Sequence, residues 1–437
     1  MAPKHQAPRG TRDLLPGEIE RWQWVEARAR EVLERYCYRE IRTPLFEDYE
    51  LFARTSGESS DLVQKEMYRF RDLKNRDLAL RPEGTASVCR AYLEHNLAAR
   101  GRIHRLWYMG PMFRYGRPQK GRSRQFWQIG AELIGSAAPA ADVEMIALFV
   151  DVFAAWGIED LTVKLNSLGT PGTRRLFEEK LRAWLAPVVE RLSPESRARY
   201  ETHPLRILDS KDPRDIVLLE GPELGVDPTS GPPPHLIDLL DEPDRRHWDA
   251  VCAGLRELGI RHEVDHGLVR GLDYYTHTAF EVHGADLGAQ SALGGGGRYD
   301  GLIEALGGPP TPGVGFSIGL DRSLLLLERR GPLPIENSGK VYVAAMEGTR
   351  AHVPAMVRAL RLVYETDYDL ENRSLNAQMK AADRAGARLV ILLGEEEWER
   401  GAVVLKDLSS GEQEIVELEH LVEALDRRLD AEETQTG

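Results

Sequence analysis

The sequence predicts an α+β protein in which helices flank a mostly antiparallel sheet. Apolar and aromatic residues recur at helical spacing through residues 18–36, which predicts an amphipathic first helix after Pro16. Short alternating segments bounded by charged turns, such as residues 126–134, are typical of antiparallel strands. At about 150 residues per domain, a chain of 437 residues has room for about three domains.

The elements of the first, larger part follow in order along the chain. After the first helix, strands are expected at residues 38–45, 67–70, 78–80, 106–109 and 126–134. From residue 173 to residue 248, helical patches are broken by proline-rich loops, which predicts an inserted helical domain. Strand-rich sequence resumes near Ile260 and runs through a glycine-rich region to Gly319, and a helix is expected over residues 320–329.

The remainder of the chain predicts a separate, smaller α/β domain. A linker at residues 331–339 precedes a strand and a helix with one apolar face. Alternating strands and helices of this kind are typical of an α/β unit. The segments are a strand at 341–345, a helix at 353–364, a helix at 375–385, and strands at 389–393 and 403–405.

Composition limits the class of protein. The 57 basic and 70 acidic residues give a net charge of −13, which on its own argues against binding to nucleic acid. The hydrophobic and charged fractions are those of a globular chain. Cys37, Cys89 and Cys252 lie too far apart for a zinc ribbon and indicate a reducing compartment. Without a signal peptide or an apolar run long enough to span a membrane, the expected location is the cytoplasm.

One stretch of this acidic protein is strongly basic. Between Glu94 and Glu132 there is no carboxylate, whereas arginine and lysine supply eight positive charges. Aromatic residues interleave with these charges, which favours a phosphate or nucleotide site. The alternative is a solvated loop face, because runs of charge often serve only solubility.

Two motifs do not support the functions that they suggest. Residues 262–266 read HEVDH and match the zinc-protease motif, but Gly259 and Gly267 bracket a segment too short for the required helix. Ile260 and Val264 suit a strand instead. The run of glycines at 294–297 is not followed by the Gly-Lys-Ser/Thr of a P-loop, so a Walker ATPase is not supported.

A glycine-rich strand at residues 313–319 has one nearly bare face. Alternation places Gly313, Gly315, Ser317 and Gly319 on one side, where a flat group can lie directly on the backbone. Arg322, at the start of the next helix, is then available to a phosphate. The alternative is a close helix-to-sheet contact that requires small residues.

Residues 110–132 predict two strands joined by a polybasic loop. Arg114 and Phe126 flank this hairpin, and an arginine beside an aromatic ring suits the phosphate and the adenine of ATP. Gln128 and Glu132 are four residues apart on one strand and share a face, so both can reach one small polar ligand.

These two segments resemble motifs 2 and 3 of class II aminoacyl-tRNA synthetases, and residues 41–44 resemble motif 1. Four further segments narrow the resemblance to histidyl-tRNA synthetases, and they lie at residues 81–85 (RPEGT), 117–122 (RPQKGR), 268–275 (LVRGLDYY) and 292–301 (ALGGGGRYDG). The resemblance implies a class II catalytic domain at residues 1–172 and 249–330, a helical insertion at 173–248 and an α/β anticodon-binding domain at 338–430.

The resemblance also implies a reaction in two steps. Histidine attacks the α-phosphorus of ATP to give histidyl-adenylate, and the histidyl group then passes to the 3′ end of histidine tRNA. ATP is a substrate, Mg²⁺ accompanies it, and no zinc is expected. The expected partners are L-histidine, ATP, histidine tRNA and a second copy of the chain in a homodimer, with no membrane.

The site residues are carried over from the family's motifs. Arg114 and Arg270 are expected to be catalytic. The implied histidine site consists of Glu83, Gly84, Thr85, Arg114, Gln128, Glu132, Arg270, Tyr274 and Tyr275. The implied ATP site consists of Arg114, Arg122, Phe126, Arg270 and Arg322, and the implied contacts to the tRNA acceptor end are Arg117, Gln119 and Lys120.

Alternatives remain open at this point. Tyr274, Tyr275 and Tyr299 could be core aromatics, and Glu83 a carboxylate at a helix start. Gly116 stands where motif 2 usually has glutamate, which leaves position 116 outside the expected site. The rival functions are the synthetase-like regulatory subunit of ATP phosphoribosyltransferase and a class II synthetase for proline or threonine.

Overall fold

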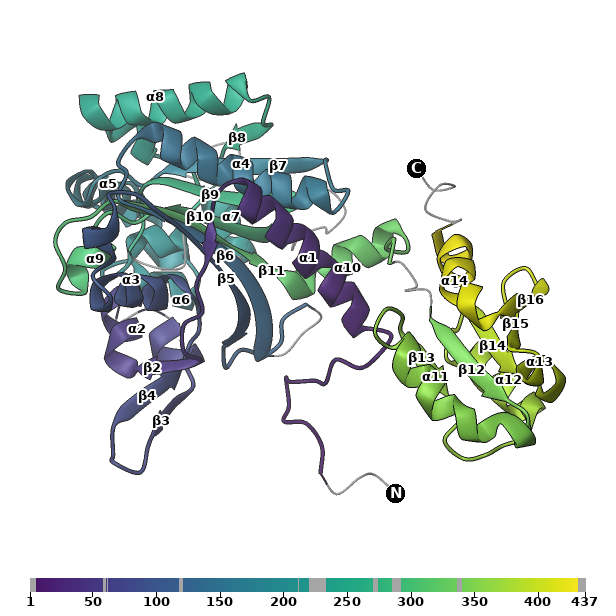
Figure 1. Ribbon diagram of the computed structural model, residues 1–437. Helices are drawn as coiled ribbons and strands as arrows, with labels where there is room; N and C mark the ends of the chain where they lie inside the picture. The colour runs from purple at the N-terminus through teal and green to yellow at the C-terminus, as the bar shows by residue number, and fades with distance from the viewer. Residues whose placement is uncertain are drawn as a thin grey trace. The chain divides into compact units, whose positions relative to one another are not determined.

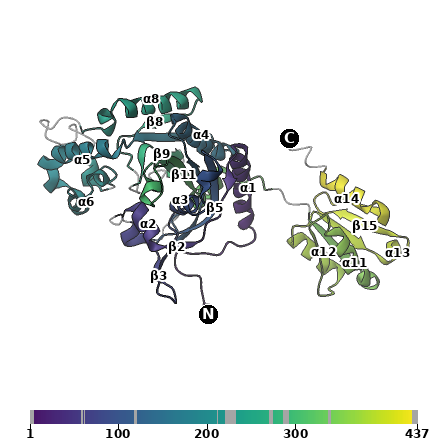
Figure 2. The same ribbon diagram turned by 60° about the vertical axis from the view of Figure 1, so that its left-hand side comes forward.

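The computed structural model shows two compact units, residues Met1–Leu333 and Pro334–Gly437 (Figures 1 and 2). Within the part of the chain that the structure describes, no helix is long and apolar enough to cross a membrane. The described residues are 5–57, 60, 62–117, 121–210, 212–219, 233–269, 274–284, 292–335 and 340–430.

An eight-stranded sheet organises the larger unit. Every neighbouring pair from β5 to β7 is antiparallel, and only the edge strands β1 and β8 run parallel to their neighbours. The predicted α+β class with a mostly antiparallel sheet is therefore confirmed. In spatial order the strands are β1 (Arg39–Glu40), β5 (His104–Phe113), β6 (Gln125–Ile134), β11 (Gly313–Gly319), β10 (Ala292–Arg298), β9 (Thr276–Gly284), β7 (Leu161–Ser167) and β8 (His262–Val264).

Helices cover both faces of this sheet (Figure 1). On one face, aromatic and aliphatic side chains such as Trp22, Phe149 and Leu327 form the largest core. The helices on this face are α1 (Ile19–Arg35), α4 (Pro139–Ala155), α8 (Glu242–Glu257) and α10 (Leu320–Arg330). On the other face, a smaller core joins β5 and β6 to α3 (Thr85–Glu94) and α9 (Leu302–Ala305).

A small second sheet replaces part of the predicted strand pattern. Of the segment expected to be one strand at 38–45, only β1 forms, and β2 begins just after it at Phe46, so that prediction was wrong for residues 41–45. Pro44 has no N–H to donate to a neighbouring strand, which explains why pairing lapses there. The second sheet is ordered β2 (Phe46–Asp48), β4 (Asp77–Leu80), β3 (Arg69–Arg71), with α2 (Tyr49–Ser56), η1 (Leu62–Glu66) and η2 (Leu97–Arg100) nearby in sequence.

A helical segment with its own apolar core lies between β7 and α8 in the chain. Phe177, Leu181 and Ile207 belong to this core. Asp215 is fully buried and accepts hydrogen bonds of 2.6–2.7 Å from Ser193, Ser196 and Ser210, which connect two short helices and the loop before the second of them. The segment contains α5 (Pro171–Leu185), η3 (Ala186–Arg191), α6 (Pro194–Arg199), η4 (Pro204–Ile207), α7 (Pro213–Leu219) and η7 (Leu236–Leu239).

The C-terminal unit is an α/β sandwich, as the sequence predicts. Strand β12 lies between β13 and β14 and runs parallel to both, and β15 and β16 continue the sheet in antiparallel fashion. The strands are β12 (Val341–Ala345), β13 (Thr366–Tyr368), β14 (Leu389–Leu393), β15 (Ala402–Asp407) and β16 (Gln413–Glu417). The helices are η9 (Glu347–His352), α11 (Val353–Leu360), α12 (Leu375–Arg384), α13 (Glu395–Glu399), η10 (Leu418–His420) and α14 (Leu421–Asp430).

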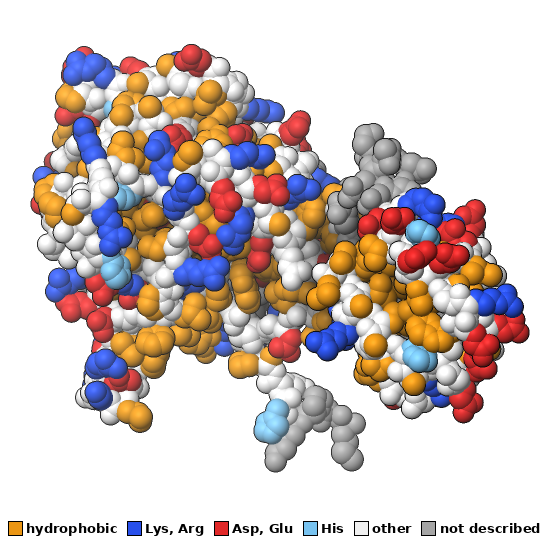
Figure 3. Space-filling model, in the orientation of Figure 1, with side chains coloured by type: hydrophobic (Ala, Val, Ile, Leu, Met, Phe, Trp, Pro, Cys, Tyr) orange, Lys and Arg blue, Asp and Glu red, His pale blue; other side chains and the backbone are white. Residues whose placement is uncertain are grey.

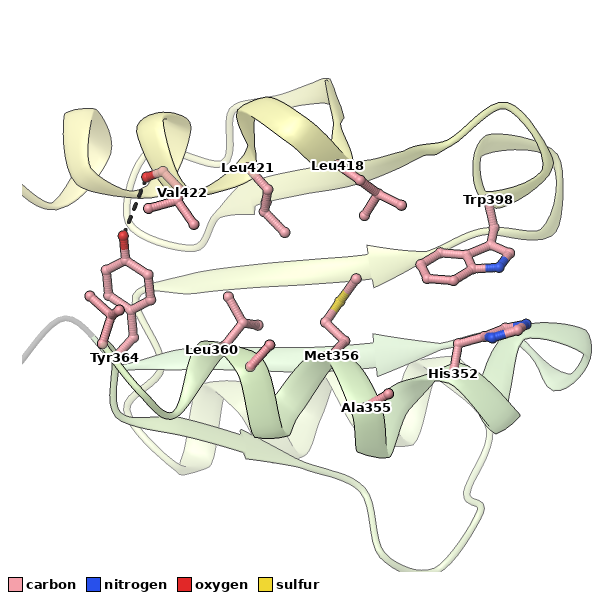
Figure 4. A pocket seen from close by; sticks show the side chains of 11 residues that line it. His352, Ala355, Met356, Leu360, Tyr364, Trp398, Leu418, Leu421 and Val422 are labelled. Carbon is pink, nitrogen blue, oxygen red and sulfur yellow. Dashed lines mark hydrogen bonds between the residues drawn. The ribbon is translucent and has the colours of Figure 1, made fainter.

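An apolar groove of about 310 Å³ lies between α11 and α14 in this unit (Figure 4). Met356, Leu360, Trp398 and Leu421 line it. Hydrophobic side chains gather on the visible face of the unit, with acidic side chains around them (Figure 3). The helix predicted to reach residue 364 ends at Leu360, and Tyr364 lies at one end of the groove.

Candidate active site

The candidate active site lies on the sheet face that α3 covers. Strand β6 pairs with β11 so that Glu132 lies opposite Gly315. A Cβ atom on Gly315 would lie 1.8 Å from Glu132 Oε2, and a Cβ on Gly313 would lie 2.2 Å from the ring of Tyr299. At Gly313 and Gly315 the bare face of β11 therefore accommodates the Tyr299 and Glu132 side chains, where the sequence had predicted space for a flat ligand.

Glu132 is fully buried and is held by hydroxyl groups. Tyr299 donates to Oε2 at 2.6 Å, and Thr85 donates to Oε1 at 2.7 Å. Tyr108 adds a longer contact of 3.5 Å to Oε1. Burial raises the pKa of Glu132 to about 8, because the carboxylate has lost its hydrating water and these hydrogen bonds offset only part of that loss.

Glu83 supplies a second buried carboxylate at the start of α3. It accepts the backbone N–H groups of Thr85 at 2.6 Å and Ala86 at 3.0 Å, which a helix start leaves without intrahelical partners. Burial raises the pKa of Glu83. Gly84 is required here because a Cβ atom would lie 2.2 Å from the ring of Tyr108.

Arg114 and Phe126 lie together at the loop end of the β5–β6 hairpin. The Arg114 guanidinium lies 5.4 Å from the centre of the Phe126 ring, and its Nε donates to the Pro82 carbonyl at 2.9 Å. Burial lowers the pKa of Arg114, but a guanidinium remains charged in a protein. On the same strand as Phe126, Gln128 has a buried Oε1 atom with no hydrogen-bond partner among the described residues.

Tyr274 and Tyr275 approach the same pocket from the segment before β9. Their rings lie 4.7 Å apart, and the ring of Tyr274 lies 6.0 Å from that of Tyr299. Tyr274 packs against the core that contains Tyr299 and Tyr108, and Tyr275 is 7% exposed. The pocket is therefore lined by phenol rings around two carboxylates.

Arg322 was predicted to bind a phosphate group. It lies in the first turn of α10, and its guanidinium donates to the Ala292 carbonyl at 2.7 Å. Burial, and after it the nearby charge of Arg122, lower the pKa of Arg322. Two arginines held near one another suit a ligand with several negative charges. The preceding residue, Asp321, accepts the backbone N–H of Trp127 at 3.0 Å and so joins α10 to β6.

The structure brings part of the predicted site together. Glu83, Gly84, Thr85, Glu132 and Tyr274 lie in one buried cluster, which is described above. Arg117 is exposed beyond the end of β5, and Arg270, Gln119 and Lys120 lie outside the described residues. Residues 262–264 form strand β8 rather than a helix, as predicted for the HEVDH segment.

Sequence reasoning missed two residues of the pocket. Tyr299 was considered only as a core aromatic, and Tyr108 was not considered. Both had a signal: Tyr299 belongs to the 292–301 motif, and Tyr108 lies in the strand that leads to Arg114, an even number of residues before it. The register of β5 and β6 places Tyr108 opposite Gly130, where its ring finds space.

Comparison with known proteins gives a consistent result. A family model described as "Histidyl-tRNA synthetase" matches residues 10–175 and 238–322, and one described as "Anticodon binding domain" matches residues 340–428. The chain is 47% identical over 420 residues to a protein of Thermosynechococcus vestitus named histidine–tRNA ligase, with 95% of each chain covered. A protein of Desulforamulus reducens with the same name is 46% identical over 420 residues, covering 95% of this chain and 97% of that one.

Among solved structures, the chain resembles apo histidyl-tRNA synthetase from S. aureus. The two share 36% identity with a TM-score of 0.79, and the match covers 96% of this chain and 99% of that one.

Proposed function

The chain belongs to the histidyl-tRNA synthetase family, and from this premise we propose how its pocket carries out the reaction. The protein is a histidine–tRNA ligase: it activates L-histidine with ATP to histidyl-adenylate and transfers the histidyl group to histidine tRNA. The observation that carries the assignment is the fully buried Glu132 carboxylate, surrounded by hydroxyls and facing a second carboxylate at Glu83.

The proposed histidine site uses both carboxylates. Glu83 accepts the α-ammonium group, with Thr85 and the unpartnered Oε1 of Gln128 beside it. Glu132 faces one nitrogen of the imidazole ring, and Tyr275 faces the other. A side chain that cannot pair both polar groups leaves them buried without partners, which is strongly unfavourable. Gly84 and Tyr274 complete the wall of this pocket.

Arg114 and Arg270 are the proposed catalytic residues. Charge builds on the α-phosphate as the histidine carboxylate attacks it, and fixed guanidinium groups stabilise that charge without reorganising. Arg114 is already held by the Pro82 carbonyl, so its position does not depend on the substrate. No covalent enzyme intermediate is needed, because alignment and charge compensation supply the catalysis.

The proposed ATP site continues from Arg114 along the hairpin. Phe126 stacks on the adenine ring. Arg322 binds the γ-phosphate, and Arg122 adds a second charge on the phosphate side. Mg²⁺ enters as part of the MgATP substrate, and no side chain is assigned to it. We propose that zinc is not required.

The remaining assignments concern tRNA and assembly. Arg117, Gln119 and Lys120 are proposed to contact the acceptor end of the tRNA, and the C-terminal unit its anticodon. The proposed domain limits are residues 1–172 and 249–330 for the catalytic domain, 173–248 for the insertion and 338–430 for the anticodon-binding domain. We further propose a homodimer in the cytoplasm.

Two measurements on the purified chain test this function. The first is exchange of pyrophosphate into ATP, with each amino acid supplied in turn, and only histidine should support it. The second is charging of a histidine tRNA transcript. A regulatory subunit of the kind considered above would support neither reaction, and a synthetase for proline or threonine would respond to its own amino acid. Either result would overturn the proposal.

A further inference from the structure

A short N-terminal segment, residues 8–12, lies against the loop end of the β5–β6 hairpin, next to Phe126. The segment is turned by hydrogen bonds from Thr11 to the Pro8 carbonyl, at 3.0 Å from the backbone N–H and 2.7 Å from the hydroxyl. Its residues are exposed or half-buried, and none is part of a described hydrophobic core. Its attachment to the protein therefore depends on polar and backbone contacts.

Gly10 makes the central contact. Its carbonyl accepts the backbone N–H of Arg124 at 2.7 Å and that of Gln125 at 3.3 Å. The Arg124 carbonyl in turn accepts the backbone N–H of Arg114 at 2.9 Å. A chain of backbone hydrogen bonds thus links the N-terminal segment to both sides of the hairpin, immediately before the strand that contains Phe126.

The side chain of Arg124 lies where a Gly10 side chain would be. A Cβ atom on Gly10 would lie 2.7 Å from Arg124 Cγ and 3.0 Å from Arg124 Cβ. The backbone fixes the Cβ position, and Cγ can move aside only if the whole Arg124 side chain rotates. The far end of Arg124 lies 3.9 Å from the centre of the Tyr115 ring, and its Nε donates to the Gly116 carbonyl at 3.4 Å. Arg124 therefore contacts both Gly10 and the opposite side of the loop, at Tyr115 and Gly116.

Arg12 anchors the other end of the segment. It pairs with Glu18, and its guanidinium lies 5.7 Å from the centre of the Trp22 ring. Trp22 packs edge-on against Trp127 at 5.5 Å, next to Phe126 in the chain. Arg12 also lines a cavity of about 190 Å³ together with Asp321, the residue that precedes Arg322. The segment thus contacts or lies beside residues adjacent in the chain to Phe126 and to Arg322.

We infer that residues 8–12 position the hairpin for ATP, with Gly10 as the positioning residue. This inference rests on the proposed function, since it assumes that Phe126, Arg122 and Arg322 bind the nucleotide. It goes beyond that function because the contacts of the segment among the described residues are with Arg124, Gln125, Glu18 and Trp22, none of which is assigned to a substrate. Glu83 and Glu132, the carboxylates assigned to the histidine site, make no hydrogen bond to the segment among the described residues. Loss of the segment should therefore weaken ATP binding more than histidine binding.

The sharpest test compares Gly10→Ala with Gly17→Ala in the full chain. Both glycines have a positive φ, +85° and +93°, so alanine strains the backbone at either position. Only Gly10 has a neighbour within contact distance of the added methyl group, and nothing lies within 4 Å at Gly17. The pair therefore separates the contact with Arg124 from the conformational strain.

Pyrophosphate exchange gives the KM of each substrate. For Gly10→Ala we expect the KM for ATP to rise about tenfold, because the hairpin that binds the nucleotide is displaced. A misplacement of about 1 Å can lower a reaction rate about 10²-fold, and a smaller displacement should have a smaller effect. The KM for histidine should stay within about twofold of the wild-type value, and Gly17→Ala should resemble wild type in both. An unchanged KM for ATP, or an equal rise in both KM values, would overturn the inference.

A pair of truncations decides the matter if Gly10→Ala does not fold. Deletion of residues 1–7 retains the segment, whereas deletion of residues 1–12 removes it and leaves α1 intact. The longer deletion should raise the KM for ATP and the shorter one should not. Equal KM values for ATP in the two deletions would refute the positioning role. Failure of the proposed function itself has a different signature, because the wild-type chain would then show no histidine-dependent exchange.

Discussion

Replacing Glu132 with glutamine removes the ionisable group from the site and leaves its shape nearly unchanged. The amide has nearly the same volume as the carboxylate. The hydroxyls of Tyr299 and Thr85, which donate to Glu132 at 2.6 and 2.7 Å, can rotate and accept from the new N–H₂ group. The variant therefore isolates the effect of the buried charge on stability and on histidine binding.

The effect on stability follows from the pKa of Glu132. The difference between its value of about 8 and the ordinary 4.5, at 1.36 kcal/mol per pH unit, gives a penalty of up to about 5 kcal/mol. Because the folded state holds this proton more tightly than the unfolded state, stability decreases as the pH rises from 4.5 to about 8. The penalty is absent below this range and complete above it. Glutamine does not titrate, so Glu132→Gln should stabilise the protein increasingly across the range.

The effect on histidine binding has the opposite sign. A hydrogen bond to a charged acceptor contributes about 1.5–3 kcal/mol, which corresponds to a roughly tenfold to hundredfold increase in KM for histidine. The loss should be largest above about pH 8, where Glu132 in the wild type is ionised. The KM for ATP should change little, because Glu132 lies within β6, away from Arg322 and Phe126.

Urea unfolding of both proteins at about pH 5, 6.5 and 8 measures the stability difference. We expect this difference to grow by about 1.4 kcal/mol per pH unit. Pyrophosphate exchange at the same pH values measures the two KM values. A stability difference that does not vary with pH would refute the raised pKa. An unchanged KM for histidine would refute the assignment of Glu132 to the imidazole.

Three further predictions follow from other parts of the molecule. Arg114→Ala should reduce exchange about 10²–10³-fold with an unchanged circular dichroism spectrum, and near-normal exchange would contradict its catalytic role. Arg298→Met should lower the free energy of unfolding, measured in urea, by about 3–5 kcal/mol, because Asp142 is then left buried without its guanidinium partner. A loss below about 1 kcal/mol would contradict a stabilising role of this buried ion pair. A chain ending at Gly331 should retain much of the exchange activity but lose most tRNA charging through loss of two-ended binding, and an equal loss of both activities would show that the C-terminal unit supports the active site.

Local patterns predicted the parts of the fold that depend on local sequence. The alternation in residues 126–134 and the helical spacing in 18–36 correspond to β6 and α1. The same alternation placed Gln128 and Glu132 on one face, and the structure has both buried on one strand. Motif spacing was informative at these positions because the side-chain direction in a strand is set by the backbone alone.

Contacts between segments far apart in the sequence could not be predicted from such local patterns. The hydrogen bond between Tyr299 and Glu132 joins residues 167 positions apart, and it depends on Gly315 and Gly313 leaving space between them. The sequence shows that β11 has a bare face, but not which side chains lie over it. Likewise, nothing in residues 8–12 indicates that Gly10 accepts hydrogen bonds from the loop end of the hairpin.

The cost of burying Glu132 also explains how the proposed pocket can select its substrate. In the empty pocket, burial and the nearby charge of Glu83 both favour the protonated form of Glu132. On the proposed assignment, histidine brings an ammonium group to Glu83 and a ring nitrogen to Glu132, so it compensates both carboxylates at once. An aliphatic amino acid compensates only Glu83 and leaves Glu132 buried without a new partner. Discrimination then comes from the unpaired carboxyl group rather than from the size of the pocket, which is why removing the charge should weaken selectivity and strengthen the fold together.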